Sequence, residues 1–185
     1  MKLSAAERTK RLEEVEDRFV DLWDNMSTLW GVSPTMARIH GMLYITGAAL
    51  SMDDIMARLA ISRGNVSMNL SRLVEWGLVR RVHKRGDRRD YYESLTDVWE
   101  MFTVLASQRK RREIDPIVKT LKQCREDLAN LDGAHGKKAD VAKPRQHLQR
   151  VDELLGFLLT VEKVAEHFFT NNQGLREAME LLAKE

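Results

Sequence analysis

The sequence is poor in cysteine and proline, and it has no long hydrophobic run. Its 185 residues include one cysteine, Cys124, so no internal disulfide can form. No uncharged apolar stretch reaches the ~18 residues that a membrane helix needs, and the first residues contain no apolar segment typical of a secretory signal. We therefore expect a cytoplasmic protein that does not associate with membranes. Three prolines allow long helices.

The common catalytic and metal-binding motifs are also missing. The five histidines are not clustered with one another or with Cys124, as a zinc or nickel site would require. No glycine-rich phosphate loop and no nucleophile motif is present. We expect no enzyme, no bound metal and no cofactor. Cys124 lies on an apolar helical seam, where a buried and unreactive thiol is a simpler interpretation than a redox switch.

The charge is distributed unevenly, although 30 basic and 28 acidic residues give a net charge of only +2. Residues 58–92 contain nine basic and three acidic side chains, a local charge of +6, so the remainder of the chain carries −4. A basic block in a nearly neutral protein indicates a surface that binds a polyanion, and a solvated surface without a partner is the alternative.

Apolar spacing predicts a mainly helical chain with an amino-terminal dimerisation helix over residues 1–30. Its apolar residues are spaced alternately three and four positions apart, which is typical of a helix with an apolar seam. The seam consists of Leu12, Val15, Phe19, Leu22, Met26 and Leu29. A second helix follows Ser33 and Pro34 and reaches Gly47.

Two short helices are predicted next. Ser51 is a typical N-cap of the first, Ala60 and Ile61 form a tight break, and Ser62 caps the second, which Gly77 ends. At about 100° per residue, the buried face of the second helix is expected to hold four apolar side chains. These are Val66, Leu70, Leu73 and Val74. The opposite face is polar, and its side chains are short near the start of the helix.

After Gly77 the helical spacing of apolar residues ends, and the sequence predicts a β-hairpin. Residues 78–83 and 89–95 are rich in branched and aromatic side chains, and they flank a turn-forming segment at 85–88. The turn carries Lys84, Arg85, Arg88 and Arg89 around its tip. Two short helices followed by a hairpin with a basic tip predict a winged helix-turn-helix within residues 31–96.

The carboxyl-terminal part, residues 97–185, is predicted to be helical and to contribute to dimerisation. A helix from Asp97 should kink or restart at Pro116, and an apolar seam follows at Ile117, Leu121, Cys124, Leu128 and Leu131. Residues 132–143 predict a mobile loop, after which Pro144 begins another helix. A last short helix carries Leu175, Met179 and Leu182.

In a winged helix-turn-helix, the second helix enters the major groove and the wing lies along the backbone or in the minor groove. Asn65 could bond an adenine edge in bidentate fashion, Arg63 or Arg72 a guanine or a phosphate, and Met68 a thymine methyl. The predicted DNA-binding residues are Ser62, Arg63, Gly64, Asn65, Ser67, Met68, Ser71, Arg72, Lys84, Arg85, Asp87, Arg88 and Arg89. An ordinary amphipathic helix in water is the alternative for the helix alone, and the basic hairpin argues against it.

Several segments resemble a known family. Residues 87–96, DRRDYYESLT, resemble the wing signature of MarR-type regulators, an Asp-x-Arg followed by Leu-Thr. Residues 61–70 and 76–79 resemble the GbsR/MarR branch more narrowly, and the similarity continues through 98–99 and 111–116. The resemblance implies a homodimeric regulator of transcription that binds a near-palindromic duplex. It also implies that Arg89 enters the minor groove and that Asp87 holds the wing arginines.

The aromatic residues of the helices are a candidate effector site. Trp23, Trp30, Tyr44, Trp99 and Phe102 lie on helices that should meet between the dimerisation helices and the DNA-binding unit. Aromatic faces attract quaternary ammonium groups, and members of the GbsR/MarR branch are associated with osmoprotectant genes, so a choline- or betaine-like ligand is one hypothesis. Core packing is the other interpretation of these residues.

The sequence thus predicts a mainly α winged-helix homodimer that binds operator DNA and represses or modulates transcription, with a small-molecule effector as a further partner. The alternative is a helical module that uses its winged helix to contact proteins. A steep salt dependence of duplex binding would separate the two hypotheses.

Overall fold

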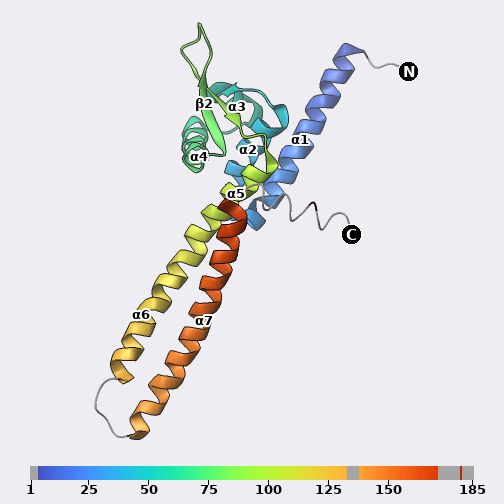
Figure 1. The fold of residues 1–185 in the computed structure, drawn as a ribbon. Helices are drawn as coiled ribbons and strands as arrows, with labels where there is room; N and C mark the ends of the chain where they lie inside the picture. Colours follow the sequence, from blue (N-terminus) through green and yellow to red (C-terminus); the bar gives the residue numbers. More distant parts are fainter. Residues whose placement is uncertain (1–3, 133–137, 171–179, 181–185) are drawn as a thin grey trace. The chain divides into compact units, whose positions relative to one another are not determined.

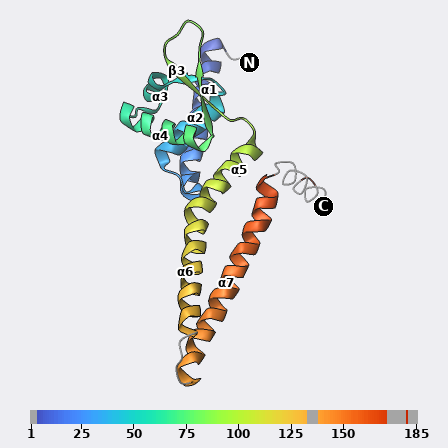
Figure 2. The same cartoon turned by 60° about the vertical axis from the view of Figure 1, so that its left-hand side comes forward.

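The computed structural model of the chain describes residues 4–132, 138–170 and 180. It divides into two compact units, residues 1–105 and 106–185. The expected mainly helical fold with a β-hairpin wing is confirmed, and the helices and strands are shown in Figures 1 and 2. Among the described helices, none combines the length and the apolar character that crossing a membrane requires.

The first unit contains a long helix, three shorter helices and a small sheet, followed by the first part of α5. In chain order the elements are α1 (Ala5–Trp30), α2 (Pro34–Thr46), β1 (Leu50–Ser51), α3 (Met52–Leu59), α4 (Arg63–Trp76), β2 (Val79–His83), β3 (Asp90–Ser94) and α5 (Val98–Arg109).

The short helices begin and end where the polar and glycine residues predict. Ser33 Oγ accepts a hydrogen bond of 3.2 Å from the Met36 N–H at the start of α2. Ser51 Oγ accepts one of 3.3 Å from the Asp54 N–H at the start of α3. Such N-caps satisfy backbone donors that have no partner within the helix. Gly77 ends α4 with φ +80°, a conformation that favours glycine.

Ala60 makes the tight break between α3 and α4. It ends α3 in the left-handed region, with φ +53° and ψ +42°, and it is the only described residue other than glycine with a positive φ. This conformation costs a residue with a Cβ about 1–2 kcal/mol, so the turn between the two helices is held by the packing on either side. Ser62 then adopts the extended N-cap conformation, although its side chain makes no capping bond.

The core of this unit lies between α2, α3, α4 and the sheet. Ile39, Leu43, Ile55, Val66 and Leu70 are each at most 1% exposed. Leu73 is buried as predicted, whereas the prediction for Val74 is wrong, because its side chain is 36% exposed. The buried face of α4 is turned toward Asn69, which is 1% exposed, and Val74 lies at the opposite edge of that face.

The sheet has three antiparallel strands in the order β1-β3-β2. Strand β1, which periodicity did not predict because it has two residues, pairs Leu50 with Tyr92 and Ser51 with Tyr91. At the wing tip the Asp87 N–H donates to the Lys84 carbonyl over 3.1 Å. Gly86 has φ +86°, the sign that the third residue of a type II turn requires.

Helix α1 packs on α2 at a close approach between Gly41 and Trp23. A Cβ built on Gly41 would lie 2.8 Å from Trp23 Cβ, so a glycine is needed at this contact. Along the predicted seam of α1, four apolar side chains are 45–71% exposed in the single chain, which leaves an apolar stripe uncovered. They are Leu12, Val15, Leu22 and Leu29.

The second unit contains the π-helical segment η1 (Lys110–Ile114) and two long helices, α6 (Asp115–Asp132) and α7 (Lys138–Thr170), which lie side by side (Figures 1 and 2). A helix restart near Pro116 was expected, and α6 begins one residue before it. A proline suits the first turn of a helix because its missing N–H would have no partner there.

Two predictions for the second unit need correction. Helix α7 begins at Lys138 and contains Pro144, so Pro144 does not start the helix and residues 138–143 are not a loop. A proline inside a helix removes its own N–H bond and crowds the carbonyl four residues earlier, and residues 138–143 before Pro144 are helical nonetheless. Asp132, the first residue of the predicted loop, is the last residue of α6. Residues 133–137 of that loop and the predicted last helix with Leu175, Met179 and Leu182 lie outside the described residues.

The expectation that Cys124 is buried is also wrong, because its side chain is exposed. Helix α7 covers the face of α6 that carries Val118, which is 8% exposed. Cys124 is six residues further along, about 120° around the helix from Val118. Ile117 and Leu131, on the same seam as Cys124, are 48% and 59% exposed.

Candidate nucleic-acid interface

The polar face of α4 is open to solvent over the whole length that was predicted to meet DNA. Asn65 is half-buried, and Met68 is 51% exposed between polar neighbours. The other residues predicted on this helix and at its cap are all exposed, and they are Ser62, Arg63, Gly64, Ser67, Ser71 and Arg72. A Cβ on Gly64 would meet no atom within 4 Å, so this end of the helix is uncrowded. Short side chains at the amino end of a helix allow it to approach base edges closely.

The two arginines of this face differ in their partners. Arg63 forms an ion pair with Asp53 of α3, and its Nη1 lies 3.8 Å from the Met52 sulfur. Arg72 forms no ion pair or hydrogen bond with any described residue. Arg63 is therefore partly occupied by a carboxylate, whereas all the donors of Arg72 are available in the structure as it stands.

The wing is organised by a cluster of Asp87, Arg89 and Tyr91. Asp87 Oδ2 accepts hydrogen bonds of 2.7 Å from Arg89 Nη2 and 2.7 Å from the Tyr91 hydroxyl. Asp87 Oδ1 accepts a further bond of 2.9 Å from the Arg89 backbone N–H. Arg89 Nη2 also donates to the Tyr91 hydroxyl over 2.7 Å. The guanidinium is therefore held in one orientation beside the turn.

The same cluster changes the ionisation of its members. Hydrogen bonds from Arg89 and Tyr91 hold the pKa of Asp87 well below its usual range. The hydrogen bond to Asp87 raises the pKa of Arg89, and it also raises the pKa of Tyr91. The cluster therefore favours the ionised form of Asp87 and the charged form of Arg89.

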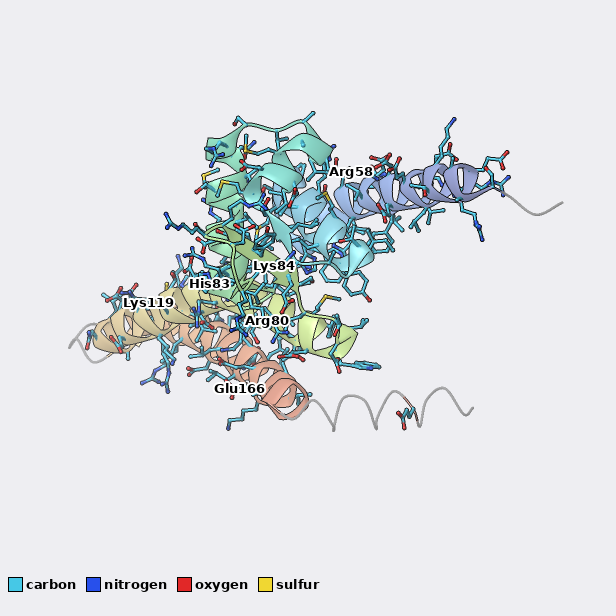
Figure 3. The ribbon with its side chains drawn as sticks, turned by 90° about the horizontal axis from the view of Figure 1, so that it is seen from above. Arg58, Arg80, His83, Lys84, Lys119 and Glu166 are labelled. Carbon is cyan, nitrogen blue, oxygen red and sulfur yellow. The ribbon has the colours of Figure 1, made fainter. Side chains whose placement is uncertain are left out.

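Lys84 does not extend freely from the wing tip. Its Nζ donates to the Ala49 carbonyl over 3.1 Å and lies 3.8 Å from the centre of the Tyr91 ring. Arg85 and Arg88 are exposed and form no ion pair with any described residue. Figure 3 labels Lys84 with Arg80 and His83 of the neighbouring strand β2. Arg85 and Arg88 thus carry the extended positive charge of the wing, and Lys84, which also has no carboxylate partner among the described residues, carries its charge close to the sheet.

Ion pairs neutralise a large part of the basic block at residues 58–92. Arg58, for example, reaches from α3 to α1, where its Nη2 lies 2.9 Å from Asp17 Oδ1 and 3.2 Å from Glu16 Oε2 (Figure 3). The basic residues with such partners are Arg58, Arg63, Arg80, Arg81 and Arg89. The count of basic residues therefore overstates the charge that a partner would meet.

The sequence patterns missed Asn69, a buried polar residue on α4. Its Nδ2 donates to the backbone carbonyl and to Oδ1 of Asn65, each over 2.8 Å, and its Oδ1 accepts from Ser33 Oγ over 3.1 Å. The only sequence signal is the spacing of the two asparagines, one helical turn apart. Tyr91, the third member of the wing cluster, was also missed.

The aromatic candidate site is only partly assembled. Trp23 stacks on Tyr44 and contacts Trp30, with ring centres 5.8 Å and 6.1 Å apart. Phe19 and His40 join the same cluster. Trp99 is half-buried on α5 and contacts none of these rings among the described residues, and Phe102 is 44% exposed on the same helix. The cavity beside Trp23 and Trp30 has a volume of about 30 Å³, which is room for one water molecule.

Helices α3 and α4, the tight break between them and the hairpin wing form a winged helix-turn-helix. Residues 30–90 match the model of the MarR family. This match confirms the resemblance to MarR-type regulators that the sequence predicted.

Relatives extend over more of the chain. YvaV of Bacillus subtilis (strain 168), named as an HTH-type transcriptional regulator, is 23% identical over 85% of this chain and 89% of its own length. OpcR of the same organism, named as an HTH-type transcriptional repressor, is 20% identical over 85% of both chains. A solved structure described as a transcriptional regulator is 20% identical with a TM-score of 0.52, covering 84% of this chain and 95% of its own, and it supports the fold.

Proposed function

We propose that this protein is a transcriptional repressor that binds a specific DNA duplex as a homodimer. The observation that carries the proposal is the Asp87-Arg89-Tyr91 cluster, which holds an arginine in a fixed orientation at the wing, next to a recognition helix with an open polar face. Because the guanidinium is ordered before binding, less side-chain entropy is lost when it contacts DNA. The names of YvaV and OpcR support transcriptional regulation, and that of OpcR supports repression.

The apolar stripes support a homodimer. Leu12, Val15, Leu22 and Leu29 on α1 are exposed in the single chain. On α7 a second stripe at heptad spacing is formed by Leu154, Phe157, Val161 and Val164, which are 47–63% exposed. Contiguous apolar stripes of this kind are typical of interfaces, and a second copy would bury both. In this proposal residues 1–30 and 97–185 provide the dimer contacts and residues 31–96 bind DNA.

A small-molecule effector at the aromatic cluster remains a prediction. The rings of Trp23, Tyr44 and Phe19 already stack on one another, and a cavity of about 30 Å³ cannot hold a quaternary ammonium ligand. Such a ligand would have to separate the stack. Trp30→Ala, which removes a ring beside Trp23 and the cavity, should abolish a response of DNA binding to choline or betaine and leave a folded dimer. Loss of folding in this variant would support the core interpretation instead.

Selection of bound duplexes from a random pool tests the proposed function. We expect a motif with two-fold symmetry, because the two reading heads of a dimer engage half-sites about one helical turn apart. A salt titration on the selected duplex should show a steep log-linear loss of affinity, and Arg89→Ala should flatten the slope by roughly one for each phosphate that the variant no longer neutralises. Weak binding that is indifferent to sequence would overturn the proposal and favour a protein-binding module.

A further inference from the structure

We infer that Asn69 is a positioning residue that presents Asn65 to DNA as a hydrogen-bond donor, so that this chain selects a keto base, guanine or thymine, at the position under Asn65. The inference rests on the proposed function and specifies one base contact of the recognition helix.

The orientation of the Asn69 amide follows from its neighbours. The backbone carbonyl of Asn65 can only accept, so the Asn69 atom 2.8 Å from it is the nitrogen. The Asn69 oxygen then faces Ser33 Oγ over 3.1 Å. Ser33 Oγ accepts from the Met36 N–H, so its own proton is free to be donated to Asn69. Each donor in this network meets an acceptor.

The orientation of Asn65 follows in turn. Asn69 Nδ2 has two protons, and the one that is not donated to the Asn65 carbonyl lies toward the Asn65 side chain over 2.8 Å. The atom that receives this proton must be the oxygen, Oδ1, because an amide nitrogen is a donor. Asn69 is 1% exposed and cannot turn toward water, so Oδ1 of Asn65 is held toward the body of the helix.

This arrangement leaves the Asn65 amide nitrogen as the group that meets the groove. Asn65 Nδ2 donates to no described residue, and both of its protons are available. In the major groove guanine presents two acceptors, O6 and N7, and thymine presents O4. Adenine presents one acceptor, N7, but the N6 amino group beside it is a donor that would face the Asn65 donor, and cytosine presents only a donor. The bidentate adenine contact suggested by the residue type alone is therefore replaced by a contact with a keto base.

Selection from a random duplex pool with four proteins tests this inference. Asn65→Ala identifies the base position that Asn65 contacts, because the base preference should be lost at that position of the motif. The wild type should prefer guanine or thymine at that position by roughly tenfold over adenine or cytosine. Asn69→Leu, which cannot donate, should lower this preference several-fold while the rest of the motif is kept. Ser33→Ala is the matched control, because both bonds from Asn69 to Asn65 remain and the preference should persist.

Asn65→Asp gives a test that does not depend on the folding of the Asn69 variant. A carboxylate offers only acceptors, so the preference at this position should move toward cytosine, whose N4 amino group is a donor. A wild-type motif with adenine or cytosine at the Asn65 position would overturn the inference and leave the proposed function intact. An unchanged preference in folded Asn69→Leu would also overturn it. Failure of the wild type to select any motif would instead count against the proposed function.

Discussion

Trp23 Nε1 donates a hydrogen bond of 3.1 Å to Nδ1 of His40. Because an indole N–H is a donor only, Nδ1 must be the unprotonated nitrogen of the ring. Nε2 therefore carries the proton and donates to Ser94 Oγ over 3.1 Å, and the Ser94 hydroxyl donates to the Leu95 carbonyl over 2.9 Å. A directed chain of hydrogen bonds thus joins α1, α2 and the end of β3 through a neutral histidine.

The neutral state of His40 predicts a loss of stability in mild acid. Burial lowers the pKa of His40 from 6.5 to about 4. The unfolded chain takes up a proton at this residue below pH 6.5, while the folded chain does not do so until about pH 4. The contribution of His40 is complete above pH 6.5 and should fall by roughly 3 kcal/mol as the pH drops to 4. Denaturant unfolding at several pH values measures this loss.

His40→Gln separates this residue from the other groups that titrate. Glutamine has no ionisable group, so the stability of the variant should change less with pH between 6.5 and 4 than that of the wild type. The variant is expected to be less stable at pH 7, because glutamine cannot place an acceptor and a donor at both ring nitrogen positions. Equal pH dependences of the two proteins would show that His40 is not buried in the neutral form.

Gly41→Ala should destabilise the first unit. The added Cβ would lie 2.8 Å from Trp23 Cβ and 2.9 Å from Trp23 Cγ, and these atoms are too close to the α1 backbone to move independently. Overpacking of this kind typically costs about 1–3 kcal/mol. The midpoint of thermal or denaturant unfolding measures the effect.

Gly64→Ala is the matched control for Gly41→Ala. Gly64 also lies inside a helix, and its Cβ would meet nothing within 4 Å. Alanine should therefore stabilise the protein by roughly 0.5–1 kcal/mol through its higher helix propensity. If both variants changed stability in the same direction, the close contact between α1 and α2 would not be the cause.

The sequence predicted the elements better than the contacts between them. Ser33, Ser51 and Gly77 mark helix ends because capping is local chemistry that depends on a few neighbouring residues. The exposure of Val74 and the burial of Asn69 depend instead on how α4 is rotated against α2, which involves Ser33, a residue 36 positions earlier. A helical wheel drawn for α4 alone cannot show how this helix is rotated against α2.

In the candidate site too, contacts between residues close in sequence could be predicted, and contacts between distant elements could not. The pairing of Asp87 with Arg89 could be inferred from a motif because the two residues are close together in the turn. The hydrogen bond from Lys84 to the Ala49 carbonyl could not be inferred, because the neighbouring strand β1 has only two residues and leaves no periodic signal in the sequence. Cys124 was misjudged because an apolar seam does not reveal whether its cover comes from the same chain.

Asp87→Ala should weaken DNA binding although it makes the wing more positive. The substitution removes the acceptor of the bonds from Arg89 and Tyr91, so Arg89 would have to be ordered by the DNA itself. We expect affinity for the selected duplex to fall roughly tenfold at fixed salt, as for the removal of one well-placed hydrogen-bonding group. Fluorescence anisotropy with a labelled duplex measures this change.

Glu75→Ala is the control for the change in charge. Glu75 is exposed on α4, it makes no ion pair with a described residue, and its removal also adds one positive charge to the unit. Binding should become tighter or stay the same, because only a long-range repulsion is removed. Tighter binding by both variants would mean that Asp87 acts through its charge and not by holding Arg89.

Phe157→Glu should separate the proposed dimer. Phe157 is 63% exposed at the middle of the α7 stripe, where a partner would enclose it, and an unpaired carboxylate in such an interface is strongly unfavourable. We expect the dissociation constant of the dimer to rise by roughly a hundredfold or more, as measured by sedimentation. Lys163→Glu, which makes a larger charge change on an exposed position of α7 away from the stripe, should leave the dimer intact. Dissociation in both variants, or in neither, would place the dimer contacts elsewhere in the chain.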